Sequence, residues 1–154
     1  MTSHTRRPVP VIPGIRVVRS SIHGYGVVAS RRFEPGEVIS QVDGIMWREE
    51  EDLDDRYSLW VDDGIYLDMV DQTRWINHSC EANAEIEADV DGQGGAWARV
   101  VALRAIETGE EITYDYGFPF DLAERCSCGA KTCRGWIVDA DELPALLASQ
   151  SSSP

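Results

Sequence analysis

The chain has 154 residues, of which 43% are hydrophobic, so it can bury one core but is too short for two large domains. Its 27 acidic residues outnumber the 14 basic ones and give a formal net charge of -13. This charge repels a phosphate backbone and favours partners rich in Lys and Arg, so direct binding to nucleic acid is not expected.

The N-terminal segment has the features of neither a signal peptide nor a membrane anchor. Arg6 and Arg7 are not followed by an apolar run of about seven residues, and the chain has no hydrophobic span of about 18 residues. We therefore expect a soluble, intracellular protein that does not bind a membrane. Residues 1–13 contain three prolines and are predicted to form a flexible leader, and residues 149–154, which read SQSSSP, are predicted to fray.

Short runs rich in β-branched residues dominate the region between these ends, and turn-forming sequences separate them. This pattern predicts a mostly β chain. Asp62-Asp63-Gly64 predicts a tight hairpin, and the glycine-rich residues 91–95 predict a second, longer one. The predicted strands span residues 15–19, 26–29, 37–40, 59–61, 65–67, 84–88, 96–103 and 111–114.

Helical signals are weak. Residues 49–57 could form a short helix, residues 72–76 a single turn, and residues 141–144 the start of a terminal helix. The sequence has no internal repeat.

The cysteines are the first indication of chemistry. The stretch CSCGAKTC supplies Cys126, Cys128 and Cys133, and Cys80 in RWINHSCEAN is the fourth thiol of the chain. Zn²⁺ in structural sites takes four thiolates at about 2.3 Å in a tetrahedron, and a C-x-C pair with a third cysteine five residues later can wrap three of its corners. Cys80 would then complete the site.

The charges nearby agree with a metal. Four thiolates around Zn²⁺ carry a net charge of about -2, and Arg125, Lys131 and Arg134 lie beside the cysteines in an otherwise acidic chain. Two disulfides or four unrelated buried thiols are the alternatives. Disulfides are disfavoured without a secretory signal, and a C-x-C pair is too close to bridge comfortably.

With these residues located, the chain resembles the SET-domain protein lysine methyltransferases that carry a post-SET zinc tail. Four motifs in the family's order support the resemblance, which covers most of the chain. They are HGYG at 23–26 followed by VVA, RWINHSC at 74–80 with Asn83, GEEITYDYG at 109–117, and the cysteine tail. A pair of glycines alone would mean little, whereas the four motifs together are specific.

The resemblance implies a mostly β fold of several small curved sheets with few short helices and a C-terminal zinc loop. It also implies a knot-like crossing, in which the segment with Asn77 and His78 is threaded past the chain that carries Asp115 and Tyr116. Ordinary folds avoid such threading, so only the resemblance predicts it. On this basis a SET catalytic domain is expected at 14–120, a post-SET zinc-binding segment at 121–138, and a tail with a short helix and a disordered end at 139–154.

The resemblance further implies methyl transfer from S-adenosylmethionine to the ε-amine of a protein lysine, with Zn²⁺ as a structural metal. Such a transfer needs alignment and a neutral amine. A lysine with a pKa near 10.4 is neutral in about one of a few thousand molecules at pH 7, so an apolar channel assists directly. The residues that the resemblance assigns to the cofactor are Gly24, Tyr25, Gly26, Arg74, Asn77, His78 and Trp136.

Some of these residues have structural alternatives. Gly24 and Gly26 would let the backbone approach the cofactor, but they could also form a simple turn after the first strand. His78 could be a buried histidine with satisfied nitrogens, and Trp136 could pack against the zinc loop instead of covering the adenine.

Two tyrosines match the catalytic positions of the family. Tyr116 would orient the lysine nitrogen with its hydroxyl and need not act as a bulk base, because a phenol has a pKa near 10. Tyr114 would lie on the same face of a strand. In this family a tyrosine at this position accompanies the addition of fewer methyl groups, so mainly monomethylation is expected.

The chain departs from the family at one wall of the lysine channel. After the predicted strand 37–40 many members have a tyrosine, whereas this chain has Val42 within Gln41-Val42-Asp43-Gly44. The acidic run at 49–55 lies where the family has a substrate-recognition insert. It is either solvated surface or a docking edge for a basic segment.

The sequence therefore favours an enzyme that methylates a lysine in a basic protein or peptide. It would be cytoplasmic, or nuclear or nucleoid-associated if its substrate is a chromatin protein. The alternatives are a catalytically silent SET-fold binding module and a methyltransferase for a small amine. Retention of Asn77 and Tyr116 argues against the silent module.

Overall fold

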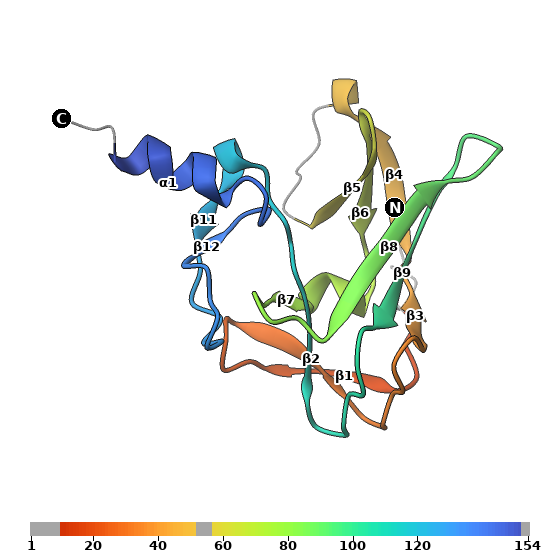
Figure 1. Ribbon diagram of the computed structural model, residues 1–154. Coiled ribbons are helices and arrows are strands. Elements are labelled where there is room, and N and C mark those ends of the chain that lie inside the picture. Colours follow the sequence, from red (N-terminus) through yellow and green to blue (C-terminus); the bar gives the residue numbers. More distant parts are fainter. Residues whose placement is uncertain (1–9, 52–56, 152–154) are drawn as a thin grey trace, which may run out of the picture.

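The computed structural model describes residues 10–51 and 57–151 and confirms a mostly β chain (Figure 1). Within this part of the chain, the strands form four small sheets rather than one large one. The short strands follow from a sequence in which turn residues interrupt the β-branched runs every few positions.

The first sheet brings together segments that are far apart in the sequence. Its strand order is β1-β2-β10-β7, in which the first three strands pair antiparallel and β7 pairs parallel with β10. Thr113 lies opposite Asn77, and Tyr114 lies opposite His78. The strands are β1 (Ile15–Arg19), β2 (Tyr25–Ala29), β7 (Asn77–His78) and β10 (Glu111–Tyr114).

Two three-stranded antiparallel sheets contain the predicted hairpins. The hairpin at Asp62-Asp63-Gly64 joins two strands of the sheet β4-β6-β5, and residues 91–95 join two strands of the sheet β3-β9-β8. Gly64 has a φ of 66°, a left-handed conformation that a tight turn requires and that glycine adopts at low cost. The strands are β3 (Val38–Gln41), β4 (Gly44–Arg48), β5 (Ser58–Asp62), β6 (Ile65–Met69), β8 (Ala84–Val90) and β9 (Ala96–Ala102).

The core lies between these sheets in two adjoining clusters. The larger cluster contains fully buried residues such as Phe33, Ile106 and Ile112, and the smaller one contains Val61 and Leu67. Burial of each such side chain contributes about 1.5–3 kcal/mol. Tyr114 belongs to the larger cluster, so this candidate catalytic position rests on the best-packed part of the molecule.

The helical elements are short. The helix expected at 49–57 is a single 3-10 turn, η1 (Glu49–Glu51), and residues 52–56 of that expectation lie outside the described residues, as does most of the acidic run. The turn expected at 72–76 is confirmed as η2 (Gln72–Trp75), which begins where the carboxylate of Asp71 accepts a hydrogen bond from the Thr73 backbone amide.

The C-terminal part lies beside the sheets, with α1 near one end of the molecule (Figure 1). The terminal helix α1 (Leu143–Ser151) is confirmed, and it continues past residue 149, where fraying was predicted. None of the described helices has the length and hydrophobicity that a membrane crossing requires. The remaining elements are η3 (Phe120–Leu122), β11 (Glu124–Arg125) and β12 (Trp136–Ile137).

Candidate active site and metal centre

The segments that the resemblance expects to cross are hydrogen-bonded to each other. The backbone amide of Ser79 donates to the Tyr114 carbonyl at 3.2 Å, and the amide of Tyr116 donates to Nδ1 of His78 at 3.1 Å. Asn83 extends the contact, because its Oδ1 accepts from the Thr113 amide at 2.9 Å. Residues 76–83 and 111–116 therefore form one bonded unit, which brings Asn77 and His78 next to Tyr114 and Tyr116.

Tyr116 lies at the centre of this unit. Its hydroxyl donates to the Ile76 carbonyl at 2.6 Å, and its ring centroid is 4.7 Å from that of Tyr114 and 5.5 Å from that of Phe118. Burial, and next the negative charge of nearby Glu111, raises the pKa of Tyr116 well above its usual range. The phenol is therefore protonated at neutral pH and acts as a hydrogen-bonding group, not as a base.

Tyr114 is more deeply buried, and burial raises the pKa of its hydroxyl well above the usual value. Within the described residues no hydrogen-bond partner contacts this hydroxyl, in contrast to that of Tyr116. Tyr114 thus presents an unpaired hydroxyl beside the ring of Tyr116, as a group that could hold a water molecule would.

Asn77 is buried beneath the loop that carries the paired glycines. Its Nδ2 donates to the carbonyls of His23 and Tyr25, at 3.1 and 2.9 Å, and lies 3.3 Å from Oε2 of Glu111. Because all three neighbours are acceptors, the amide nitrogen must face them. Oδ1 of Asn77 is then the atom that can accept a hydrogen bond from a ligand.

The two glycines of the loop have different structural roles. Gly24 has a φ of 46° with open space around its Cα, so its conformation is what favours glycine. Gly26 is buried in β2, and a Cβ added there would lie 2.9 Å from Oε1 of Glu111. Both glycines were predicted to serve the cofactor. The bond between Ser20 and Glu111 was not predicted, because the motif that contains Glu111 does not indicate what surrounds its side chain.

An aromatic cluster surrounds Arg74. The guanidinium lies 4.2 Å from the ring centroid of Tyr57, and the Trp75 ring lies edge-on to both Tyr57, at 5.7 Å, and Tyr25, at 5.8 Å. Among the described residues Arg74 has no carboxylate partner, and its buried Nε has no acceptor. A ligand with a carboxylate would supply the missing negative charge.

Tyr57 is a residue of this site that the sequence analysis missed. It lies two residues after the acidic run, just before β5, and it is close enough to Tyr116 to contribute to the raised pKa of that phenol. Its only sequence signal is an aromatic residue next to a strand. Val42, which replaces the expected wall tyrosine, packs between the two core clusters and lines a surface depression with Gln41 and Asp71.

The side chain of His78 is directed at protein atoms. Its Nδ1 accepts from the Tyr116 amide, so the proton is on Nε2, which lies 3.4 Å from Sγ of Cys80. Burial lowers the pKa of His78 and keeps the ring neutral. The side chain therefore connects the tyrosine segment to the cysteines, and any cofactor contact is left to the His78 backbone.

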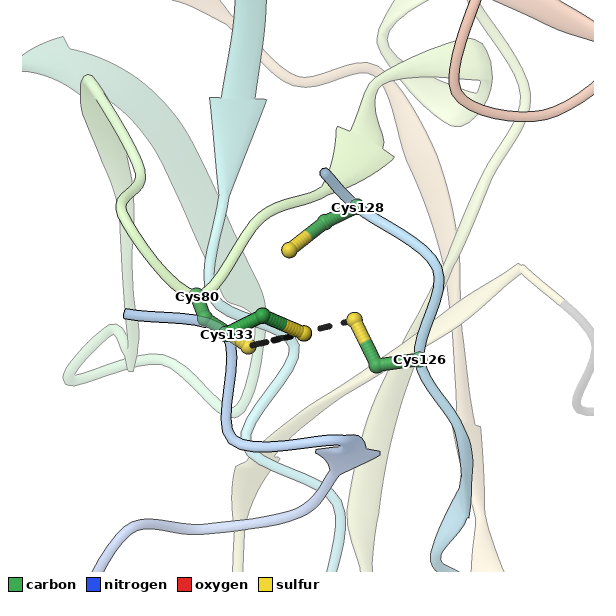
Figure 2. A group of neighbouring side chains, drawn as sticks. All are labelled: Cys80, Cys126, Cys128 and Cys133. Carbon is green, nitrogen blue, oxygen red and sulfur yellow. Dashed lines mark hydrogen bonds between the residues drawn. The ribbon is translucent and has the colours of Figure 1, made fainter. Parts of the chain in front are cut away.

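The four cysteines converge from two distant segments, with their sulfur atoms directed at a common centre (Figure 2). All four Sγ atoms lie within 4.8 Å of one another, and Sγ of Cys80 is 3.8 Å from that of Cys126 and 4.0 Å from that of Cys133. A zinc tetrahedron with bonds of about 2.3 Å places its sulfurs about 3.8 Å apart. The thiols are unbridged, so the arrangement fits Zn²⁺ and not two disulfides.

The tail that supplies three of these cysteines is attached to the tyrosine segment by Arg134. Its backbone amide donates to Sγ of Cys80 at 3.4 Å, and its Nη2 donates to the carboxylate of Asp115 at 2.8 Å and to the Val138 carbonyl at 3.1 Å. Amide donors of this kind stabilise thiolates. Of the three cations predicted to compensate the site, Arg134 supplies this amide and also a guanidinium whose charge favours the Cys80 thiolate.

Trp136 lies in β12, which pairs with β11 beside the cysteines. The guanidinium of Arg125 lies 4.2 Å from the centroid of its ring, so one face of the indole is covered within the tail.

Comparison with known proteins identifies the class to which this fold and site belong. Residues 24–117 match the SET domain family. The chain therefore belongs to the SET-domain family.

Two curated relatives are named as histone-lysine N-methyltransferases. The chain is 38% identical over 137 residues to histone-lysine N-methyltransferase trithorax of Drosophila virilis. The match covers 80% of this chain and 4% of the relative. It is also 37% identical over 141 residues to histone-lysine N-methyltransferase 2B of Homo sapiens. This match covers 80% of this chain and 5% of that protein. The chain thus spans a small fraction of the length of these relatives.

Solved structures agree with the fold. A crystal structure of KRYPTONITE in complex with mCHG DNA and SAH has a TM-score of 0.70 and 27% identity, over 80% of this chain and 28% of that one. A second KRYPTONITE structure, which contains mCHH DNA, an H3(1-15) peptide and SAH, has a TM-score of 0.69 and 26% identity over 80% of this chain and 29% of that one. The fold of several small sheets predicted from the motifs is thereby confirmed.

Proposed function

We propose that this chain is an S-adenosylmethionine-dependent methyltransferase that acts on the ε-amine of a lysine in a basic protein or peptide. The main support is the position of Tyr116, a protonated phenol held on the Ile76 carbonyl next to Asn77, in a member of the SET-domain family. The relatives are named histone-lysine N-methyltransferases, and the second KRYPTONITE structure contains an H3 peptide. A chromatin protein is therefore the first substrate class to test.

The cofactor supplies a methyl group on a positively charged sulfonium. For its amino-acid end, Oδ1 of Asn77 offers an acceptor to the ammonium group, and Arg74 offers a cation to the carboxylate. Tyr25 and Gly24 contribute the loop above Asn77, and the backbone at His78 and the ring of Trp136 are assigned to the adenine. Gly26 makes room for Glu111 within the same loop.

The lysine must reach the site as a neutral amine. The rings of Tyr57, Tyr114, Tyr116 and Phe118 form aromatic surroundings that penalise an ammonium ion without a counter-charge. The hydroxyl of Tyr116 then orients the nitrogen, which aligns the displacement. The net charge of -13 favours a substrate rich in Lys and Arg and argues against DNA as a partner of this chain.

We assign Zn²⁺ to Cys80, Cys126, Cys128 and Cys133 as a structural metal, because their sulfurs fit its tetrahedron. The same assignment supports a division into a SET catalytic domain at 14–120, a post-SET segment at 121–138 and a tail from 139.

The experiment is a transfer assay with S-adenosylmethionine labelled in its methyl group and a panel of lysine-rich proteins that includes an H3 peptide. We expect label on the panel, and Tyr116→Phe should reduce the rate about 100-fold, because misplacing a reacting nitrogen by about 1 Å costs on that order. Tyr66→Phe is the matched control, since Tyr66 stacks on Trp47 in another sheet. Equal rates for Tyr116→Phe and the unaltered chain would contradict the role of Tyr116, and cofactor binding without transfer to any panel member would favour a silent binding module.

We further propose that the product is mainly monomethyl-lysine, because the unpaired hydroxyl of Tyr114 beside Tyr116 can hold a water in the space that added methyl groups need. Tyr114→Phe should shift a single-lysine product towards dimethyl and trimethyl forms, as measured by mass spectrometry. Efficient trimethylation by the unaltered chain, with no change in Tyr114→Phe, would show that Tyr114 does not limit the product.

A further inference from the structure

We propose that Glu111 is a positioning residue for the cofactor, which fixes the amide of Asn77 and the loop 20–25 in the arrangement that receives the amino-acid end. This role rests on the proposed function, because it concerns the pocket assigned there. Neither the sequence motifs nor the family comparison assigns a role to this carboxylate.

Glu111 joins two parts of the candidate pocket. Its Oε1 accepts a hydrogen bond from the Ser20 hydroxyl at 2.7 Å, and its Oε2 lies 3.3 Å from Nδ2 of Asn77. The Ser20 oxygen in turn accepts from the backbone amides of Ile22, at 2.9 Å, and His23, at 3.4 Å. The Glu111 carboxylate thus connects Asn77 to Ser20, which follows β1, and through Ser20 to the backbone of the loop.

The charge of Glu111 reinforces the orientation of the Asn77 amide that the carbonyls of His23 and Tyr25 favour. With the carboxylate and two carbonyls on one side, a rotated amide would place Oδ1 against three oxygens, and Asn77 is buried, so water could not relieve the repulsion. A glutamine at 111 would remove the charge and present a donor as well as an acceptor. The preference for one amide orientation would then weaken.

Gly26 provides the space that this arrangement needs. A Cβ at 26 would lie 2.9 Å from Oε1 of Glu111 and 3.0 Å from Cβ of Ser20, so any larger residue would displace the carboxylate or the serine. The neighbouring Glu110 has no such environment, because its side chain forms a surface ion pair with Arg104. Two adjacent glutamates of the same motif therefore have different roles.

The test compares Glu111→Gln with Glu110→Gln in the full chain by calorimetric titration. The probes are S-adenosylmethionine, S-adenosylhomocysteine and 5′-methylthioadenosine, which lacks the amino-acid end. Glu111→Gln should weaken binding of the first two equally, by about tenfold or more, since hydrogen bonds to a charged group are of that strength. It should leave binding of 5′-methylthioadenosine within about twofold, and Glu110→Gln should leave all three unchanged.

The outcomes separate the possible failures. If the unaltered chain binds neither S-adenosylmethionine nor S-adenosylhomocysteine, the proposed function fails and this role fails with it. If the unaltered chain binds both and Glu111→Gln binds them as tightly, only the role of Glu111 is wrong. A loss for all three probes indicates general damage to the pocket, and a loss for S-adenosylmethionine alone indicates direct attraction of the sulfonium. Either result also contradicts positioning through Asn77.

Ser20→Ala provides a second variant in case Glu111→Gln does not fold. It removes one of the two anchors of the carboxylate and leaves the contact with Asn77 in place. Binding of S-adenosylhomocysteine should fall several-fold, while binding of 5′-methylthioadenosine stays the same. Unchanged binding of S-adenosylhomocysteine to Ser20→Ala would overturn the proposal.

Discussion

At the scale of single residues, the buried phenols at 114 and 116 predict how stability depends on pH. Burial raises the pKa of both hydroxyls in the folded chain, whereas in the unfolded chain they ionise near pH 10. Above about pH 10 the unfolded state therefore binds fewer protons than the folded state, and the free energy of unfolding must fall as pH rises. Tyr114→Phe removes one of these groups, so denaturant unfolding between pH 8 and pH 11 should show a shallower decline in the variant. An equal decline in the free energy of unfolding for both proteins would show that folding does not raise the pKa of Tyr114.

The residues found from the sequence are those to which the family's motifs assign a role. Asn77, Tyr116 and the four cysteines were predicted in this way; the structure places Asn77 and Tyr116 in one bonded unit and brings the four cysteines together. Glu111 and Tyr57 were missed, because what distinguishes them is the environment and not the residue type. Glu110 and Glu111 are identical letters, and only the fold places one on Arg104 and the other on Ser20.

At the scale of elements, the antiparallel hairpins could be predicted and the parallel pair could not. Hairpins such as β5 and β6 depend on a turn and an alternating pattern that lie within one stretch of sequence. β7 has two residues, and its partner β10 is more than thirty residues away, so no local pattern encodes the pairing. The resemblance supplied that contact because the family's motifs carry information on long-range pairing.

The ends of the helical elements were also hard to predict from the sequence. The charged residues from Glu49 were interpreted as a short helix, but η1 ends at Glu51, and the described chain resumes at Tyr57 in a turn that leads into β5. At the other end α1 reaches Ser151, beyond the predicted start of fraying. Serine and glutamine are only moderate helix formers, so the sequence alone gives a weak prediction of where such a helix ends.

At the scale of the whole molecule, the cysteine cluster connects the sheet β1-β2-β10-β7 to the tail. Cys80 lies two residues after β7, and its sulfur contacts both the His78 ring and the Arg134 amide. Arg134 also binds Asp115, the residue before Tyr116. The tail is thus attached at the same segment that carries the candidate catalytic residues, so metal binding and the shape of the pocket should be coupled.

Removal of the metal with a chelator should therefore loosen the tail and weaken cofactor binding, while the sheets remain folded on their own core. Limited proteolysis should cleave within 118–142 and leave 14–117 intact, and the melting temperature should fall on the order of 5 °C, which corresponds to about 2 kcal/mol in a domain of this size. Protons compete with the metal for the cysteine thiolates, so chelation should be easier as the pH falls. Cys133→Ser should reproduce these effects, and Ser127→Ala, at an exposed residue of the same loop, should not.

Two results would contradict this coupling. If chelation made 14–117 as susceptible to proteolysis as the tail, the metal would be supporting the whole fold. If cofactor affinity stayed the same, the metal centre and the pocket would be independent.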